Sequence, residues 1–318
     1  MTHAKRPLGR TGLAISPLVF GGNVFGWTTD KQTSFDLLDR FTGAGFETVD
    51  TADVYSYWKP GNVGGESETI IGEWMRARNC RSRIILITKV GMQMAPDRKG
   101  LSAAWIERAV EDSLRRLQTD HIDVYLSHKY DPDAPHEETL AAYQKLITAG
   151  KVRAVGASNY DAGQLRAALD TAGAKGLPRY EVLQPEYNLY DRKSYDGALR
   201  ELAMAEGLGV ITYFSLAKGF LSGKYRSEAD LGLSPRGGGV KAYLNERGFR
   251  ILRALDEVAE RQGAKPAEVA LAWLMAHPGV TAPIASATSL NQLDSLIRAA
   301  SLALTGEDLV ALEDASGA

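Results

Sequence analysis

Four side chains of types that can together move a proton stand at the ends of three neighbouring predicted strands. Asp50 ends the first of these strands and Tyr55 follows it, Lys89 lies at the end of the second, and His128 follows the third. Singly, each type has an ordinary structural explanation: a surface lysine, a core histidine, or an aspartate that caps a turn. Strand ends of a barrel meet at one face, so the joint placement favours a catalytic interpretation.

The chemistry that such a set can perform is proton exchange with a carbonyl/alcohol couple. A free phenol has a pKa near 10, and an ammonium about 4 Å away at an effective dielectric constant near 20 can lower it by roughly 2 to 3 units. We therefore expect Lys89 to act on Tyr55 and Asp50 to keep Lys89 charged. His128 would hydrogen-bond the oxygen of the substrate carbonyl or help to relay its proton. The set holds no hydride source, so it requires a cofactor.

Eight short β-branched and aliphatic runs must position these residues. They lack polar alternation, which is typical of strands buried on both faces of a parallel sheet. The runs are Leu18–Phe20, Thr48–Asp50, Ile84–Thr88, Ile122–Leu126, Ala154–Ala157, Val182–Gln184, Val210–Tyr213 and Val280–Ile284. The first seven follow one another at about 28 to 38 residues, the size of one βα unit, with helical patterns between them such as Ser102–Gln118.

This repeat predicts the α/β class and a single closed (β/α)8 barrel over residues 1–318, in preference to an open doubly wound sheet. Residues 5–16 read as a β-hairpin before the first barrel strand. About 70 residues separate the last two strands, and they contain a loop over Ser222–Gly239 and helical patterns near Glu246–Gln262 and Pro266–His277.

Composition excludes several classes of protein. With 37 Lys+Arg against 39 Asp+Glu and a formal net charge of −2, the chain has no electrostatic footprint for nucleic acid or an anionic membrane. The single cysteine, Cys80, excludes a disulfide framework and a cysteine-rich metal site, and we expect no metal. The N-terminus lacks the apolar core of a secretory signal and no run approaches 18 apolar residues, so we expect a cytoplasmic protein.

The sequence lacks the usual dinucleotide-binding motif, because no G-x-G-x-x-G follows a predicted strand. Ser158, Asn159 and Gln184 at further strand ends offer amide and hydroxyl groups that suit a carboxamide, and Tyr213 offers a flat face for a planar ring. These four could equally be ordinary strand-end turn residues.

Eight segments of the chain resemble the aldo-keto reductase family, in the family's order and spacing. They are PLGRTGLAISPLVFGG, ETVDTADVY, ITKVG, IDVYLSHKYDP, GKVRAVGASNY, LQPEYNLYDR, YFSLAKGFLSGKY and TAPIASATSLNQL. The resemblance implies a barrel closed at its base by the N-terminal hairpin. It also implies reversible NAD(P)H-dependent reduction of aldehydes or ketones, with NADP(H) preferred and NAD(H) as an alternative.

The resemblance also assigns roles to residues of this chain. Tyr55 becomes the general acid, with Asp50, Lys89 and His128 completing the tetrad. Ser158, Asn159 and Gln184 would hold the nicotinamide carboxamide, and Tyr213 would stack on the ring. Further cofactor contacts are implied for Gly22, Asn23, Asp50, Phe214, Ser215, Leu216, Ala217, Lys218, Gly219, Lys224, Ser286, Thr288, Gln292 and Ser295.

The chain departs from the family at the phosphate contacts. Many relatives carry Ser-Pro-Leu after the stacking tyrosine, where this chain has Phe214-Ser215-Leu216. The usual basic residue is absent from Ser286–Ser289, and the family's later Glu-Asn pair reads Ser295-Leu296. A 2′-phosphate favours basic partners, and Lys218, Lys224 and Arg236 are the candidates; we hypothesise that Arg236 folds onto the cofactor phosphates.

The substrate is less readable. Aromatic residues in loops beside the tetrad, together with His128, suggest apolar walls, although each could instead serve loop packing: Phe25, Trp27, Tyr57, Trp58 and Tyr130. The sequence does not choose among sugars, methylglyoxal-like aldehydes and aromatic aldehydes. Nor does it indicate an oligomeric state.

Two other functions are compatible with these residues. One is a cofactor-binding regulatory subunit, because the β subunits of voltage-gated potassium channels resemble the same family and keep the tetrad; a large apolar patch would favour it. The other is a lyase that uses Lys89 as a Schiff base.

Overall fold

The structure is a computed structural model that describes residues 3–235 and 237–317. Its centre is a closed barrel of parallel strands in the order β10-β3-β4-β5-β6-β7-β8-β9. The strands are β3 (Val19–Gly21), β4 (Thr48–Asp50), β5 (Ile85–Val90), β6 (Ile122–Ser127), β7 (Val152–Ser158), β8 (Val182–Gln184), β9 (Gly209–Thr212) and β10 (Ala282–Ala285). The predicted α/β barrel is thereby confirmed.

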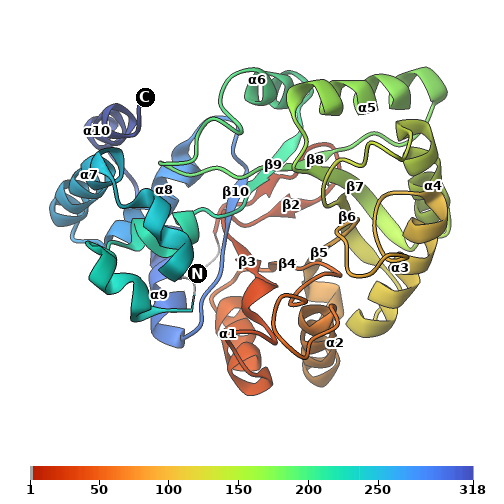
Figure 1. The fold of residues 1–318 in the computed structure, drawn as a ribbon, viewed down its shortest axis with the longest axis horizontal. Coiled ribbons are helices and arrows are strands. Elements are labelled where there is room, and N and C mark those ends of the chain that lie inside the picture. The colour runs from red at the N-terminus through yellow and green to blue at the C-terminus, as the bar shows by residue number, and fades with distance from the viewer. Residues whose placement is uncertain (1–2, 236, 318) are drawn as a thin grey trace.

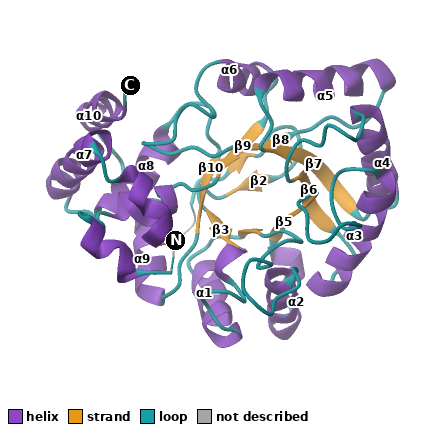
Figure 2. Ribbon diagram, in the orientation of Figure 1, coloured by secondary structure: helices purple, strands orange, loops and turns teal. Residues whose placement is uncertain are grey.

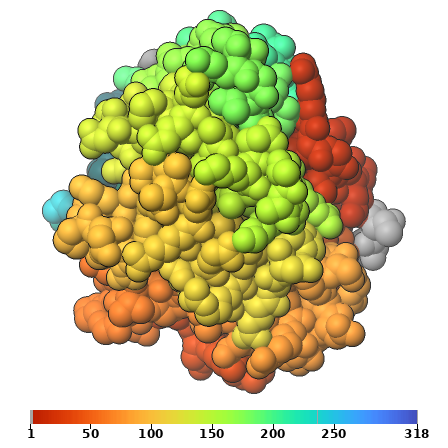
Figure 3. Space-filling view, turned by 90° about the vertical axis from the view of Figure 1, so that its right-hand side faces the viewer, coloured from red at the N-terminus to blue at the C-terminus, as the bar shows by residue number. Residues whose placement is uncertain are grey.

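Helices surround the barrel on its outside (Figures 1 and 2). They are α1 (Lys31–Gly43), α2 (Glu66–Arg78), α3 (Ala103–Leu117), α4 (His136–Thr148), α5 (Ala162–Lys175), α6 (Ala198–Ala205), α7 (Glu246–Gln262), α8 (Pro266–Ala276), α9 (Leu290–Ala299) and α10 (Gly306–Ser316). Figure 3 shows the side of the molecule where the yellow and green segments with α3, α4 and α5 lie, with the red N-terminal segment at its right-hand edge.

Helix α3 shows how local sequence sets an element. Ser102 caps its start by accepting a hydrogen bond from the Trp105 amide, and Gln118 ends it in a left-handed conformation with φ 53°. The apolar stripe that includes Ile106 and Val110 is buried, while the remaining face is charged. The predicted helix over Ser102–Gln118 therefore includes both caps.

The N-terminal hairpin closes the base of the barrel, as expected. Strands β1 (Arg6–Pro7) and β2 (Ala14–Ile15) pair antiparallel. Leu8 and Ile15 are fully buried and belong to the same apolar cluster as the inward-facing strand residues Val19, Val124 and Ile211. The hairpin thus completes the interior packing at the end opposite the strand ends that carry Asp50 and Lys89.

The long connection between β9 and β10 contains more structure than the predicted loop over Ser222–Gly239. Short 3₁₀ segments η3 (Ala217–Ser222), η4 (Glu228–Leu233) and η5 (Gly237–Tyr243) precede α7 and α8. Among the described residues, no helix is both long and apolar enough to cross a membrane.

Candidate active site

The four predicted catalytic side chains meet at the C-terminal ends of β4, β5 and β6. Neighbouring strands pair so that Asp50 lies opposite Ile87, and Lys89 opposite Leu126. Lys89 is fully buried, and its Nζ donates to Asp50 Oδ2 at 2.6 Å, to the Thr51 carbonyl at 2.7 Å and to Tyr55 Oη at 3.2 Å. The ammonium therefore joins the carboxylate to the phenol inside the barrel mouth.

The electrostatics favour a charged lysine. Burial acts to lower the pKa of Lys89, but the charge of Asp50 and the phenol of Tyr55 outweigh burial, so the pKa is raised. Burial also raises the pKa of Asp50, against the opposing effects of Lys89 and Gln184. All three Lys89 protons have acceptors, and a Schiff-base nucleophile must be a neutral amine, so this arrangement disfavours the lyase alternative.

His128 completes the set as a neutral imidazole. Its ring lies 6.0 Å from the Tyr55 ring, centroid to centroid, at an interplanar angle of 72°. Burial, followed by the charges of Lys89 and Lys129, holds the pKa of His128 well below its usual value. Its Nδ1 is buried and has no hydrogen-bond partner among the described residues. A neutral ring beside Tyr55 can hydrogen-bond a substrate oxygen without adding charge.

Further strand ends bring the predicted carboxamide residues into one connected line. Gln184 Nε2 donates to Asp50 Oδ1 at 2.8 Å, and the Ser158 hydroxyl donates to the Gln184 carbonyl at 2.9 Å. Asn159, in a left-handed conformation, donates to the His128 carbonyl at 2.9 Å and accepts from Tyr213 Oη at 2.6 Å. These uncharged amide and hydroxyl groups fit a nicotinamide carboxamide, and burial raises the pKa of Tyr213, which keeps its ring neutral.

The turn after β9 contains the residues predicted to contact the cofactor phosphates. Phe214, Ala217, Lys218 and Gly219 all have positive φ angles, between 46° and 103°. The amides of Ala217 and Gly219 donate to the carbonyls of Phe214 and Leu216 within the turn. Lys218 Nζ lies 5.4 Å from the Phe214 ring centroid. A Cβ at Gly219 would lie 4.0 Å from Lys224 Cε, so a second cation borders the same turn.

Other residues of this segment have internal partners. The Ser215 side chain is buried and its hydroxyl donates to the Thr212 carbonyl at 3.0 Å. Ala217 is fully buried and Leu216 packs against the outer core. Arg236 lies outside the described residues, so its predicted position over the phosphates stays a prediction.

The predicted adenosine residues near β10 are mostly bonded to one another. Ser286 Oγ donates to Asn23 Oδ1 at 2.6 Å, and Thr288 donates to Gln292 Oε1 at 3.1 Å. Ser295 is only 7% exposed, and its hydroxyl donates to Glu268 at 2.6 Å, so its side chain offers little surface and no free hydroxyl proton to a cofactor.

Gly22 lies between the strand ends. A Cβ there would stand 2.8 Å from Ser67 Oγ and 3.1 Å from the Asp50 carbonyl, so only glycine fits without displacement.

Two of the predicted substrate residues differ in exposure. Phe25 is fully buried and stacks on Phe20, so it presents no surface to a ligand in this structure. Trp58 is 45% exposed, and its ring lies 5.6 Å from the Tyr55 ring.

The structure also contains a buried acidic pair near the tetrad, Asp53 and Glu68, which the sequence analysis does not predict. Asp53 is 1% exposed, and neither of its carboxyl oxygens has a hydrogen-bond partner among the described residues. Glu68 nearby takes hydrogen bonds from Thr88 at 2.6 Å and Arg116 at 2.7 Å. Burial, and then the charge of Glu68, raise the pKa of Asp53 well above its usual range. The signal available in the sequence was an acidic residue two positions before Tyr55.

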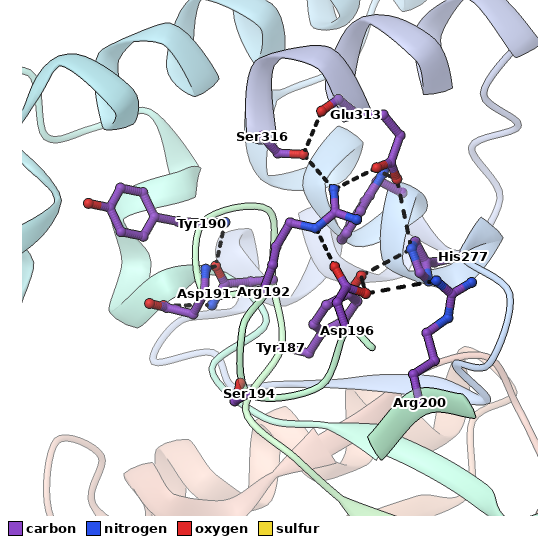
Figure 4. Close-up of polar contacts among 12 residues, drawn as sticks. Tyr187, Tyr190, Asp191, Arg192, Ser194, Asp196, Arg200, His277, Glu313 and Ser316 are labelled. Atoms are coloured by element: carbon purple, nitrogen blue, oxygen red, sulfur yellow. Dashed lines mark hydrogen bonds and ion pairs between the residues drawn. The ribbon is translucent and has the colours of Figure 1, made fainter. Parts of the chain in front are cut away.

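A polar network holds the loop that follows β8 (Figure 4). Arg192 donates to Asp196 at 2.7 Å, to Glu313 at 2.5 Å and to Ser316 at 2.7 Å, which ties the loop to α10. On the same loop, Asn188 Nδ2 donates to the Phe214 carbonyl at 3.0 Å. The network therefore supports the turn that carries Tyr213 and Phe214.

Within residues 3–235 and 237–317, no group of three or more His, Cys, Asp or Glu side chains is placed to hold a metal ion.

Comparison with known proteins gives a consistent result. Residues 17–316 match the sequence model of the Aldo/keto reductase family. The "Uncharacterized oxidoreductase YrpG" of Bacillus subtilis (strain 168) is 35% identical over 315 residues, which cover 96% of this chain and 94% of that protein. "Aldo-keto reductase AMT2" of Alternaria alternata is 32% identical over 343 residues, covering 98% of this chain and 91% of that protein.

A third relative carries a different kind of name. "Probable voltage-gated potassium channel subunit beta" of Oryza sativa subsp. japonica is 33% identical over 295 residues, covering 90% of this chain and 88% of that protein. With a family match over nearly its whole length, this chain belongs to the aldo/keto reductase family, and that membership supports an NAD(P)H-dependent oxidoreductase.

Proposed function

We propose that this protein reversibly reduces an aldehyde or ketone to the alcohol, with Tyr55 as the proton donor. The observation that carries the proposal is the buried Lys89 ammonium, which contacts Asp50 Oδ2 at 2.6 Å and Tyr55 Oη at 3.2 Å. A positive charge at this distance stabilises the phenolate that remains once Tyr55 has protonated a substrate oxygen.

Each remaining residue has a part in this reaction. Asp50 keeps Lys89 charged and oriented, and the neutral His128 hydrogen-bonds the carbonyl oxygen. Ser158, Asn159 and Gln184 would hold the carboxamide of a nicotinamide cofactor, and Tyr213 would face its ring. The cofactor supplies the hydride when bound.

We propose NADP(H) as the preferred cofactor, with NAD(H) as the alternative. Lys218 and Lys224 border the turn after β9 and support phosphate binding. Residues 285–292 contain no lysine or arginine, so a 2′-phosphate would depend on cations from other segments.

The test follows NADPH and NADH absorbance during incubation with aldehydes, ketones and sugars, using wild type and Tyr55→Phe. We expect oxidation of the cofactor by wild type, at least 10²-fold slower turnover in the variant, and unchanged cofactor affinity by fluorescence titration. Equal loss of turnover and cofactor affinity would make Tyr55 structural and contradict the proposal.

The likeness to the Oryza sativa protein supports one other candidate, a cofactor-binding regulatory subunit. That function predicts tight cofactor binding without turnover of any carbonyl in the panel, so the same experiment separates the two functions.

A further inference from the structure

We propose that Trp58 and Trp27 form a fixed aromatic corner beside Tyr55, which selects substrates whose carbonyl carries a flat aromatic or conjugated group. The inference rests on the proposed carbonyl reduction and extends it to a substrate class.

The corner is defined by ring contacts. The centroid of the Trp58 ring lies 5.6 Å from that of Tyr55 at 64°, and 5.6 Å from that of Trp27 at 87°. His128 meets the Tyr55 ring at 6.0 Å. A carbonyl bonded to Tyr55 therefore has an imidazole and an indole close to the same phenol. Trp58 is 45% exposed, so its ring is not covered by the rest of the protein.

The loop that carries Trp58 is braced rather than free. Glu66, at the start of α2, accepts hydrogen bonds from the backbone N–H groups of Val63 at 2.7 Å and Gly64 at 3.1 Å. Asn62 Nδ2 donates to the Ser56 carbonyl at 3.0 Å. These bonds fold residues 56–65 back onto themselves.

The same loop is tied to the segment that carries Trp27. Asn62 Nδ2 also donates to the Gly26 carbonyl at 3.1 Å, and the Ser56 hydroxyl donates to the Phe25 carbonyl at 2.9 Å. A Cβ at Gly26 would stand 2.8 Å from Glu66 Cβ, so the two segments are in direct contact there. The two indoles are consequently held relative to each other before a ligand arrives, and a pre-organised wall loses little conformational entropy on binding.

Such a corner can distinguish a planar aromatic ring from a saturated ring. Burial of apolar area stabilises the binding of both kinds of six-membered ring to a similar extent. Edge-to-face contact with an aromatic ring adds an attraction that only the flat ring makes, and it corresponds to roughly 2- to 13-fold in affinity. A pair of aldehydes that differ only in this respect isolates the contribution of the corner.

The experiment compares benzaldehyde with cyclohexanecarbaldehyde in the cofactor-loaded enzyme. The quantity measured is the ratio of the kcat/KM value for benzaldehyde to that for cyclohexanecarbaldehyde, in wild type and in Trp58→Ala, Asn62→Ala and Val63→Ala. Val63 is the matched control, because it is an apolar residue of the same loop and is 63% exposed. We expect Trp58→Ala to lower this ratio by about 2- to 13-fold. Asn62→Ala should lower it less, and Val63→Ala should leave it unchanged.

An unchanged ratio in Trp58→Ala overturns the inference, as does an equal fall in Val63→Ala. A binding measurement distinguishes failure of this inference from failure of the proposed reductase function. Benzyl alcohol and cyclohexylmethanol are titrated calorimetrically into cofactor-loaded wild type and Trp58→Ala. If no carbonyl is reduced but benzyl alcohol binds more tightly and loses that advantage in the variant, the corner stands and the reductase function fails. If carbonyls are reduced and neither alcohol depends on Trp58, the corner fails alone.

Discussion

At the scale of single residues, the central feature is a charged lysine in a water-poor site. Lys89 is fully buried, and it stays protonated because Asp50 and Tyr55 together outweigh the cost of burial. The tetrad residues and their placement at strand ends were predictable from residue types and spacing. What was not predictable is which groups are left without partners, since this depends on side chains from distant segments.

We expect Lys89→Met to lower kcat by about 10² to 10³, because it removes an attraction of about 4 kcal/mol between the ammonium and the developing phenolate. The methionine preserves side-chain length, so cofactor affinity should change little. Stopped-flow measurement of hydride transfer, with cofactor affinity by fluorescence, checks both expectations. A variant that turns over at the wild-type rate would show that the ammonium does not act on Tyr55.

Asp53 leads to a prediction about pH. Its pKa is raised in the folded state by burial and by Glu68, so between its unfolded pKa near 3.9 and its raised folded pKa the native protein binds the additional proton. Stability from this group is therefore greatest at low pH and declines as pH rises through that window. Asn at position 53 cannot ionise, so the stability of Asp53→Asn relative to wild type should increase with pH.

Urea unfolding of wild type and Asp53→Asn from pH 4.5 to 8 measures this difference. Glu68→Gln serves as a comparison, because Glu68 accepts hydrogen bonds from Arg116 and Thr88, and its loss should destabilise the protein across the range. A stability difference between Asp53→Asn and wild type that stays constant with pH would mean that Asp53 does not hold its proton in this window.

At the scale of elements, helix-capping residues could be predicted from the sequence, whereas hydrogen bonds between distant loops could not. The predicted bounds of α3 include both caps, because capping depends on residues near each other in the chain. For the loop after β4 the sequence predicts only that it carries aromatic residues, because the hydrogen bond from Asn62 to Gly26 that holds it in place joins residues 36 positions apart. Between β9 and β10 the helical patterns near Glu246–Gln262 and Pro266–His277 correctly predict α7 and α8. The prediction of a loop over Ser222–Gly239 misses the 3₁₀ turns there, because such turns are too short to leave a periodic pattern.

Helix α10 is held at both ends by charged groups, and its first turn gives an acid-dependent prediction. Burial opposes ionisation of Asp308, but hydrogen bonds from Arg261, Thr305 and Gln262 outweigh it and lower the pKa of Asp308 to about 2. This contribution to stability is present above the unfolded pKa near 3.9 and is lost as pH falls through about 2. We expect Asp308→Asn to cost about 1 to 2 kcal/mol at pH 7, with the cost shrinking between pH 4 and pH 2.

Thermal unfolding between pH 2 and pH 7 tests whether the hydrogen bonds to Asp308 hold the start of α10. Glu307→Gln is the matched control, because it changes a neighbouring exposed carboxylate in the same helical turn. If both variants lose the same stability with the same pH dependence, the bonds from α7 to Asp308 do not hold the helix.

At the scale of the whole molecule, the groups proposed to carry the chemistry and the N-terminal hairpin lie at opposite ends of the barrel. The tetrad and the proposed cofactor residues lie at the C-terminal strand ends, while the hairpin closes the base. The repeat of βα units made the closed barrel predictable, because its period is set by local strand and helix lengths. The packing of the hairpin against the barrel interior depends on contacts with strands far along the chain.

This separation predicts that damage to the base will cost stability and spare activity. Leu8 is fully buried among interior residues of several strands, so Leu8→Ala removes apolar contacts and leaves a cavity at a cost of about 2 to 5 kcal/mol. Leu233→Ala is the matched control: Leu233 is 60% exposed, and its truncation should stay within about 0.5 kcal/mol. Well below the unfolding transition, both variants should keep wild-type cofactor affinity and turnover. Urea unfolding and activity measured on the same samples distinguish the outcomes. If Leu8→Ala weakened cofactor binding while its unfolding midpoint stayed at that of Leu233→Ala, the base would be coupled to the site, and the division of the barrel into a stabilising end and a chemical end would be wrong.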